Sequence, residues 1–378
     1  KKMKKAYILI FSLVIMLGFS VYFFDSDSSY GPNQIALIIG AAIASLVAIR
    51  NGHLWQKILE SIVASISTAM GALLIFLCVG ALIGTWLISG TVPTLIYYGL
   101  ELLNPKIFYP AACIICAIAA LATGSSWTVA GTLGVALIAV SIGLNLSPAI
   151  AAGAIISGAY FGDKMSPLSD TTNLAPAVTG TDLFTHIRHM VWTTTPSFFI
   201  ALIIFMMLGF GVDSAIEDST ISLFTETLDK TFNITLMALL PLFVVFAMAI
   251  KKVPALPTIL FGAILGGVMA FILQPEAVMI FSNSSELHPT LSLIKGVWLA
   301  LATGYNSATG VPEIDSLLSR GGMQSMLNTM WLVISAMSFG AVLEHAGMLK
   351  RIISSSLKAA KSTGSLIMTV VLSCVSIN

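Results

Sequence analysis

Long apolar runs, separated by short polar stretches, organise almost the whole sequence. Only 9% of the residues are charged and 57% are hydrophobic, whereas a soluble domain carries roughly 25% charged residues. The chain therefore lacks the charge to cover a water-facing surface, which excludes a soluble globular protein. The runs are continuous rather than alternating, so they predict helices and not membrane β-strands. They occupy residues 6–24, 33–49, 68–89, 107–122, 127–143, 148–161, 192–211, 233–249, 255–273, 291–303, 323–343 and 364–378.

The length of the chain sets the number of membrane crossings. A span needs about 20 apolar residues, so a chain of 378 residues has room for roughly ten spans and short loops. We predict an all-α polytopic membrane protein with about 10–12 transmembrane or re-entrant helical segments. The net charge of +1 excludes an overall basic surface for nucleic acid. The expected surroundings are therefore the lipid bilayer, with no nucleic-acid partner.

Cys113 and Cys116 have the CxxC spacing of a metal or redox motif. Neither has a His, Asp or Glu near it in the sequence, and all four cysteines of the chain lie inside apolar runs. Buried cysteines mostly behave as small hydrophobic residues. We therefore predict that these two cysteines serve packing.

Positive charges beside the runs predict which ends lie in the cytoplasm. The same rule places Lys251 and Lys252 inside and the acidic loop Asp213–Lys230 outside. The segment Thr91–Lys106 is expected to turn at the outer interface. The N-terminus is expected in the cytoplasm because it carries Lys1, Lys2, Lys4 and Lys5.

The position of Arg188 predicts a hairpin. Arg188 lies on the cytoplasmic side only if the runs 107–122 and 127–143 are the two arms of a hairpin rather than one broken helix. The tip of the hairpin supplies hydroxyl groups and a glycine that permits close backbone approach. These groups could complete an ion site, or they could serve helix packing, as small residues mostly do. The tip residues are Thr123, Gly124, Ser125 and Ser126.

Residues 61–83 align with residues 321–343 at a constant offset of 260. The charges that follow each copy predict opposite orientations, which is typical of inverted-repeat transporters. The pentapeptide Ala-Leu-Ala-Thr-Gly at 120–124 and 300–304 does not fit this offset, so we interpret it as chance or as a second small-residue turn.

The repeat predicts the domain organisation. Residues 1–378 form a single membrane transporter domain, and the second copy is expected to continue after Asn378. The expected parts are N-terminal helices (1–60), a first repeat (61–211), connecting helices (212–320) and the start of a second, inverted repeat (321–378).

The strongest candidate site is the sequence GAYFGDKMSPLSDTTNLAP at 158–176. Gly162 and Pro167 are expected to break the apolar helix 148–161 and to free backbone carbonyls. Carboxylates at membrane depth usually face a water-filled cavity and mark ion or proton paths, and unwound backbone is tolerated only there. The candidate ion ligands are Asp163, Ser166, Ser169, Asp170, Thr171, Thr172 and Asn173.

Two ions suit these oxygen atoms. Na⁺ favours hard oxygen ligands on a broken helix, whereas a carboxylate in a buried position can instead carry a proton. Lys164 is either a counter-ion for the site or a residue that snorkels to the interface. The alternative for the whole stretch is a solvated cytoplasmic loop, because Asp, Ser, Thr, Asn and Pro favour loops.

Three stretches resemble the NhaC family of Na⁺/H⁺ antiporters. They are ATGSSWTVAGTLGVAL, GDKMSPLSDTTNLAPAVTGTDLFTHIRHM and SRGGMQSMLNTMWLVISAMSFGAVLEHAGML. The resemblance extends from about Ile35 onward and implies an inverted-repeat ion transporter of the bacterial plasma membrane. It also implies that Asp163 and Asp170, with Thr172 and Asn173, lie at the ion site. The second signature of the family, an SDQY-like stretch, is expected just after Asn378.

The predicted function is secondary antiport of Na⁺, or Li⁺, against H⁺, with both ions competing for Asp163 and Asp170. The NhaC family also contains malate/lactate–Na⁺ exchangers, so an organic-acid exchanger is the first alternative; Lys164 or amides near Gly124 would then meet the anion. A passive channel is the second alternative. An enzyme ranks last, because no phosphate loop, zinc spacing or nucleophile with its base is present. No cofactor is expected, and a homodimer is the default assembly.

Overall fold

The structure is a computed structural model, which describes residues 2–102, 104–167, 169, 172, 176, 180–211, 218–284, 286–348, 364–365 and 368. Within these residues the chain is helical, and the β-type pairing consists of one isolated bridge between Tyr305 and Arg320. Among the described residues, seven helices are long and apolar enough to cross a bilayer, or eight if the bent pair Ser222–Thr231 and Leu236–Ile250 is one span. The prediction of an all-α polytopic membrane protein is confirmed.

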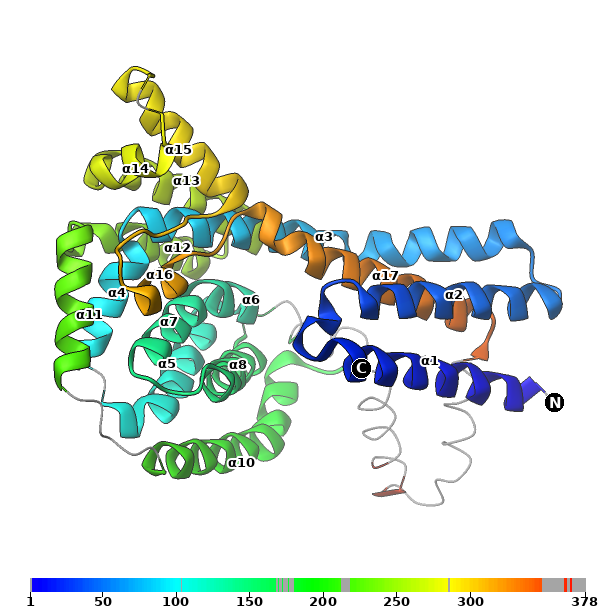
Figure 1. Cartoon of the computed structure of the whole chain (residues 1–378). Helices are drawn as coiled ribbons and strands as arrows, with labels where there is room; N and C mark the ends of the chain where they lie inside the picture. Colours follow the sequence, from blue (N-terminus) through cyan, green and yellow to red (C-terminus); the bar gives the residue numbers. More distant parts are fainter. Residues whose placement is uncertain are drawn as a thin grey trace. The chain divides into compact units, whose positions relative to one another are not determined.

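Figure 1 shows the order of the helices along the chain. The α-helices are α1 (Lys2–Phe24), α2 (Pro32–Arg50), α3 (Trp55–Ile88), α4 (Thr91–Leu102), α5 (Phe108–Thr123), α6 (Ser126–Val129), α7 (Val135–Gly143), α8 (Pro148–Met165), α10 (Leu183–Phe210), α11 (Asp218–Thr231), α12 (Leu240–Ile250), α13 (Ala255–Leu273), α14 (Pro275–Ser282), α15 (Pro289–Thr303), α16 (Pro312–Leu318) and α17 (Leu327–His345). Shorter turns are η1 (Asp25–Ser29), η2 (Pro105–Ile107), η3 (Ala130–Gly134, a π-helix), η4 (Leu236–Leu239) and η5 (Met323–Met326).

Two segments that were expected to be turns or loops are helices. Segment 91–106 contains α4, whose residues Val92, Ile96 and Leu100 are buried at helical spacing. Most of the expected acidic loop is α11, which buries Phe224 and Leu228. Both expectations were wrong because amphipathic helices with one narrow apolar face lack the continuous apolar run of a span.

The repeated pentapeptide marks two helix ends. The α5 helix ends at Thr123 and the α15 helix at Thr303, and the glycine that follows each has a positive φ, of 68° at Gly124 and 89° at Gly304. A glycine adopts this conformation without the steric strain that a side chain would add. The interpretation of the second copy as a small-residue turn is confirmed.

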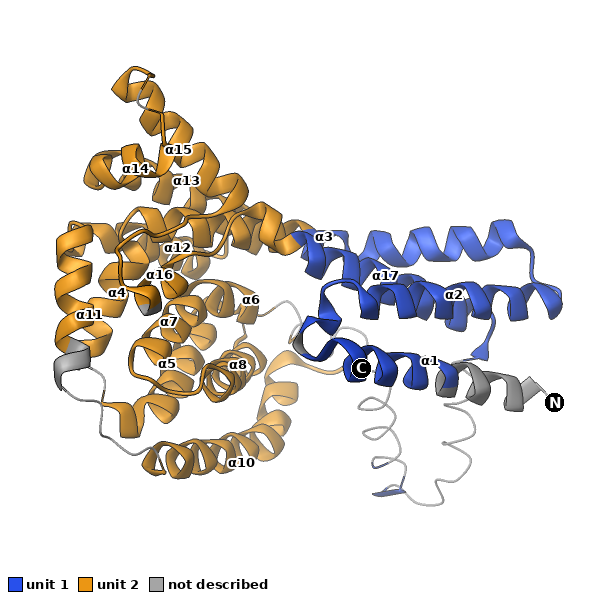
Figure 2. Ribbon diagram, in the orientation of Figure 1, with its two compact units in different colours: residues 1–73, 327–378 blue, residues 74–326 orange. Residues whose placement is uncertain are grey.

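The chain forms two compact units (Figure 2), which are residues 1–73 with 327–378 and residues 74–326. In the first unit, α2 packs against α17 through small residues. Ala44 and Ala48 are fully buried beside Val342, and a Cβ atom on Gly40 would lie 3.2 Å from the Phe339 ring. Small side chains of this kind let apolar helices approach closely in a membrane.

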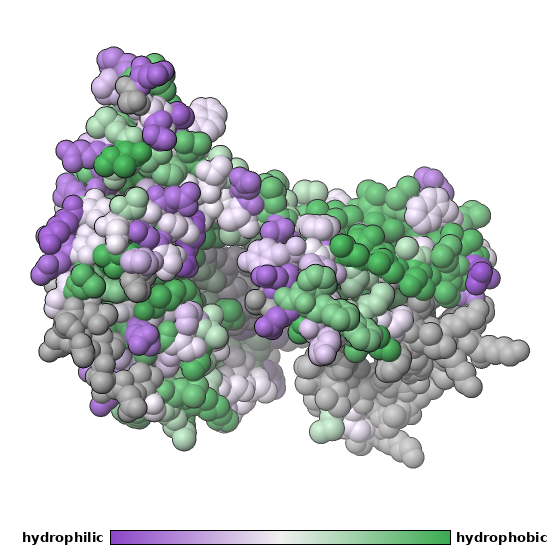
Figure 3. Space-filling model, viewed as in Figure 1, coloured by the Kyte–Doolittle hydropathy of each residue, from purple (hydrophilic) through white to green (hydrophobic). Residues whose placement is uncertain are grey.

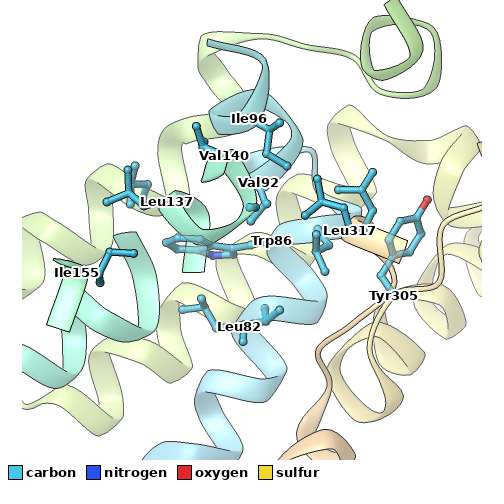
Figure 4. Packing of buried hydrophobic residues seen from close by; sticks show 14 of the residues in the cluster. Leu82, Trp86, Val92, Ile96, Leu137, Val140, Ile155, Tyr305 and Leu317 are labelled. Carbon is cyan, nitrogen blue, oxygen red and sulfur yellow. The ribbon is translucent and has the colours of Figure 1, made fainter. Parts of the chain in front are cut away.

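The second unit contains the larger core, and Trp86 of α3 lies near its centre (Figure 4). Its side chain is 1% exposed, and its Nε1 donates a hydrogen bond to the carbonyl oxygen of Gly262 at 3.1 Å. Leu82 of the same helix, Ile96 of α4 and Val140 of α7 belong to the same cluster. The indole thus packs among apolar residues while its only polar atom is satisfied.

Helices α5 and α8 make the most extensive helix–helix contact among the described residues of this unit. A Cβ atom on Gly158 of α8 would lie 2.0 Å from the carbonyl oxygen of Cys113, and one on Gly162 would lie 2.2 Å from that of Ala117. Cys113 and Cys116 of α5 are buried and free. No group of three or more His, Cys, Asp or Glu gathers among the described residues. The prediction that these cysteines serve packing is confirmed.

Large apolar side chains also cover the outside of the spans. The most apolar window of α10 has no buried residue, and its exposed side chains include Phe199, Ile203 and Met207. Figure 3 shows broad hydrophobic areas on the visible face of the molecule. Exposed apolar surface of this extent is typical of contact with lipid.

The α5–α8 contact predicts opposite effects for two glycines of the same helix. We expect Gly158→Ala to lower the unfolding temperature, because its methyl group would collide with backbone, and overpacking costs about 1–3 kcal/mol. Gly153 is the matched control, since the nearest atom would lie 3.9 Å away; Gly153→Ala should raise the temperature slightly. The unfolding temperature of each variant is measured in detergent with a thiol-reactive dye that reports when Cys113 and Cys116 become exposed. Equal effects of the two variants would contradict the packing argument.

Candidate functional site

The α8 helix carries the first half of the candidate site. It begins at Pro148 and continues through Gly162 and Asp163 to Met165. The expectation that Gly162 breaks the helix was therefore wrong; this glycine instead permits the close approach to α5. The helix ends at Ser166, which is extended with ψ 125°, as expected for a residue that precedes a proline, here Pro167.

Hydroxyl groups satisfy the carbonyls at the end of α8. Thr172 Oγ1 donates to the carbonyl oxygens of Asp163 and Lys164, at 3.1 and 3.2 Å. Ser166 Oγ donates across to the Leu121 carbonyl oxygen of α5 at 2.8 Å. Ser169 Oγ accepts from the Thr172 N–H at 3.4 Å. These bonds replace the partners that the last turn of a helix lacks and join the ends of α5 and α8.

The break between α5 and α6 carries the second half of the site. Gly124 reverses the backbone after Thr123, and Ser125 caps α6 by accepting the Thr128 N–H at 3.2 Å. The two helices on either side, Pro105–Thr123 and Ser126–Gly143, are each long enough for a span of their own. The prediction of two separate arms agrees with this division.

Asp163 contacts Ser126, the first residue of α6. Its carboxylate is nearly buried, with 6% of the residue exposed, and its Oδ2 accepts a hydrogen bond from Ser126 Oγ at 3.2 Å. An ionised carboxylate away from bulk water requires a cation or hydrogen-bond donors. A hydroxyl group gives partial compensation and leaves room for a bound cation or proton.

A cavity of about 460 Å³ opens beside Asp163. The carboxyl-terminal ends of α5 and α8 both reach it, and such ends carry the negative pole of the helix dipole. Half-helix carboxyl ends and freed carbonyls are the groups that coordinate Na⁺ in transporters with broken helices. The lining consists of Ile75, Thr123, Gly124, Ser125, Ser126, Trp127, Thr128, Tyr160, Asp163, Lys164, Ser169, Ala249, Lys252, Val253, Pro254 and Ala255.

Most of the predicted residues that the structure describes gather around this cavity. Asp163, Lys164 and Ser169 line it together with the whole predicted tip, Thr123–Ser126. Ser166 and Thr172 are buried at the end of α8 but do not line it. Three further predicted ligands lie outside the described residues: Asp170, Thr171 and Asn173.

Two other carboxylates of the chain have local structural partners. Asp182 caps α10 by accepting the Thr185 N–H at 3.0 Å. Asp315 accepts from the N–H and hydroxyl groups of Thr309, at 2.7 and 2.8 Å. Neither residue lines the cavity.

Sequence reasoning missed Lys252 as a residue of this cavity. It follows α12, far along the chain from Asp163, and was interpreted only as a charge that keeps a loop in the cytoplasm. One sequence signal was available: the pair Lys251–Lys252 is followed almost at once by Pro254, which predicts a tight turn between two spans.

Thr123 carries a buried hydroxyl group beside the cavity. It is 6% exposed, and its Oγ1 is buried without a hydrogen-bond partner among the residues that the structure describes. A buried hydroxyl in this state is unfavourable by about 1–3 kcal/mol unless a ligand or water meets it. Because Thr123 lines the cavity, its hydroxyl is a candidate oxygen ligand.

A bundle of apolar spans that encloses a cavity with a buried carboxylate is the architecture of a membrane transport protein. A family model described as the Na⁺/H⁺ antiporter family matches residues 158–378. The chain belongs to this Na⁺/H⁺ antiporter family, and the predicted resemblance to NhaC is confirmed.

Three relatives match most of the chain. The malate-2H⁺/Na⁺-lactate antiporter of Bacillus subtilis is 39% identical over 93% of this chain and 71% of its own length. An uncharacterized Na⁺/H⁺ antiporter of Haemophilus influenzae is 36% identical over 97% and 76%. The Na⁺/H⁺ antiporter NhaC of Alkalihalophilus pseudofirmus is 34% identical over 92% and 71%. No solved structure matches the chain.

The unpartnered hydroxyl of Thr123 leads to a prediction that separates ligand from packing. Thr123→Val should raise the unfolding temperature, because it removes an unsatisfied buried group, and should raise the KM for Na⁺ several-fold if this oxygen is an ion ligand. Thr94 of α4 is the control, since its Oγ1 is also buried and has no partner among the described residues, but Thr94 does not line the cavity. Thr94→Val should stabilise the protein without changing the KM. An unchanged KM in Thr123→Val would remove Thr123 from the ion site.

Proposed function

We propose that this chain exchanges Na⁺ for H⁺ across the bacterial plasma membrane, with both ions competing for the carboxylate of Asp163. The observation that carries the proposal is the position of this carboxylate, buried at the cavity where the ends of α5 and α8 meet. The sequence pattern adds Asp170 as the second member of a coupling pair. Membership of the Na⁺/H⁺ antiporter family supports the choice of ions.

The proposed binding step uses oxygen atoms only. Na⁺ lies between the Asp163 carboxylate and neighbouring hydroxyl and carbonyl oxygens, which are ligands that suit hard cations. Thr123 Oγ1 is a candidate for this role because it has no hydrogen-bond partner among the described residues. Ser126 keeps its bond to Asp163 Oδ2 and offers a lone pair of its Oγ to the ion.

Competition between the ions couples their movements. A proton on Asp163 removes the negative charge that holds Na⁺, so the bound Na⁺ leaves. An empty, ionised carboxylate is unfavourable at membrane depth, which disfavours passage of the unloaded site across the membrane. Exchange is then obligatory, and this distinguishes the protein from a passive channel.

The proposal includes an orientation. The N-terminus lies in the cytoplasm under the positive-inside rule, and Lys251 and Lys252 lie on the same side. Because Lys252, Val253 and Pro254 line the cavity, the conformation described here would open toward the cytoplasm.

Exchange of small organic acids together with Na⁺ and H⁺ is a second candidate. It is favoured by the relative from Bacillus subtilis, which is named for malate and lactate and is 39% identical to this chain. Both named acids carry a carboxylate, so the second candidate requires a cationic group near the cation site.

The direct test replaces the Asp163 carboxylate by an amide group of nearly the same size. In proteoliposomes with a trapped pH dye, addition of Na⁺ or Li⁺ should move protons through the wild-type chain, whereas Asp163→Asn should lose this movement almost completely. Asp182→Asn is the control, because asparagine caps a helix about as well as aspartate and Asp182 does not line the cavity. Normal exchange by Asp163→Asn would refute the assignment of the site.

A further inference from the structure

A π-helical turn interrupts the span that begins at the cavity. The span Ser126–Gly143 starts as α6, passes through η3 (Ala130–Gly134) and continues as α7. Turns of this kind are rare, usually occur singly inside α-helices and are frequent at functional sites. We propose that the turn aims Ser126 at Asp163, and that Thr132 is a positioning residue whose hydroxyl group holds the turn. This inference rests on the proposed cation site at Asp163.

The turn decides which face of the span meets α8. Helices α6 and α7 and the turn η3 all contact α8. Two contacts mark the shared face: Ser126 Oγ donates to Asp163 Oδ2 at 3.2 Å, and a Cβ atom on Gly134 would lie 2.9 Å from Cγ2 of Ile155.

An uninterrupted α-helix would not place both contacts on one face. Ser126 and Gly134 are eight residues apart, and at about 100° per residue they would lie about 80° apart around the axis of an α-helix. A π-helical turn takes up one additional residue. The spacing then equals about two full turns, so that Ser126 and Gly134 both face α8.

Thr132 lies inside this turn and is bonded to the residue that precedes it by one turn. It is fully buried and does not line the cavity. Its Oγ1 donates to the Thr128 carbonyl oxygen at 2.6 Å. Carbonyl oxygens pair with N–H groups four residues on in an α-helix but five residues on in a π-helix. The Thr132 hydroxyl therefore bridges the point where the spacing changes, and a side chain inserted into the backbone ladder is a recognised cause of a change in helix path.

Thr128 connects the turn to the tip of the hairpin. Its N–H donates to Ser125 Oγ at 3.2 Å, and its Oγ1 donates to the same atom at 3.0 Å. Ser125, Ser126 and Thr128 all line the cavity. Because Ser126 lies between the two bonded residues in the chain, its direction follows theirs, and theirs depends on the bond from Thr132.

The alternative is that Thr132 only satisfies its own hydroxyl group. Threonines in α-helices often donate to the carbonyl four residues earlier, and Thr85 of α3 donates in this way to Ala81 at 3.1 Å. Thr85 is also fully buried and belongs to the same unit, but it lies within an α-helix and does not line the cavity. It is therefore the matched control.

The test measures Na⁺ binding to the full chain in detergent, as the rise in unfolding temperature that a bound ion produces. Thr132→Val removes the hydroxyl at nearly constant volume and should raise the apparent Kd for Na⁺ about three- to tenfold, the range that loss of one hydrogen bond gives. Thr132→Ser keeps the hydroxyl and should restore most of the affinity. Thr85→Val should leave the Kd within about twofold of wild type, since distant sites act independently. Equal Kd values for Thr132→Val and Thr85→Val would overturn the inference.

A double-mutant cycle separates positioning from a general loss of stability. Ser126→Ala should also raise the Kd, because it removes the hydroxyl that Thr132 aims. Thr132→Val should then have little further effect in the Ser126→Ala chain, since residues that act through one contact are not additive. Independent effects of the two changes, or an unchanged Kd in Ser126→Ala, would show that Thr132 does not act through Ser126 and would overturn the inference.

Proton movement in proteoliposomes separates this inference from the proposed function. If Na⁺ drives protons through the wild-type chain but not through Asp163→Asn, while Thr132→Val leaves the Kd unchanged, the inference falls and Na⁺/H⁺ exchange stands. If the Kd depends on Thr132 and Ser126 but Na⁺ moves no protons, the inference stands and the exchange is contradicted. A wild-type chain that does not bind Na⁺ would overturn both.

Discussion

The close backbone contact between α5 and α8 determines where the candidate site lies. Gly158 and Gly162 allow the two helices to approach until only hydrogen atoms fit between their backbones. The contact brings both carboxyl-terminal ends to one point, where Ser166 Oγ bridges to the Leu121 carbonyl. In a bilayer, free backbone groups are tolerated only where protein or water meets them. The helix pair therefore fixes the cavity, its negative helix ends and the position of Asp163 together.

The spans were predictable because a bilayer imposes one dominant requirement, a long apolar run. Runs such as 33–49 and 255–273 became α2 and α13 with nearly the same bounds. Packing decided the features that the sequence left open. Gly162 looked like a helix breaker, yet α8 continues through it because the missing side chain is used for contact with α5. The narrow apolar face of α4 gave no run that a search for spans could detect.

The candidate site likewise has features that the sequence predicts and features that only the structure shows. Asp163 and Ser126 are predictable because carboxyl and hydroxyl groups stand beside Gly- and Ala-rich helices, which is a costly place for polar atoms. Their direct contact, at 3.2 Å, depends on the break at Gly124 and follows from no spacing in the sequence. Lys252 was missed for another reason: a lysine beside a span has an adequate explanation in membrane topology, and only the structure places it on the cavity wall.

The choice of a hydroxyl group beside Asp163 bears on how exchange works. A guanidinium group in that place would carry a permanent charge and five donors, so it would compensate the carboxylate in every state and compete with Na⁺. The Ser126 hydroxyl donates to the Asp163 carboxylate, can share a lone pair with a bound cation, and can rotate to accept a hydrogen bond from the protonated carboxyl group. This hydroxyl compensates the Asp163 carboxyl group only in part, whether that group is charged or protonated. In the proposed exchange, the transported ion supplies the remaining compensation, and this need links the loss of one ion to the binding of the other.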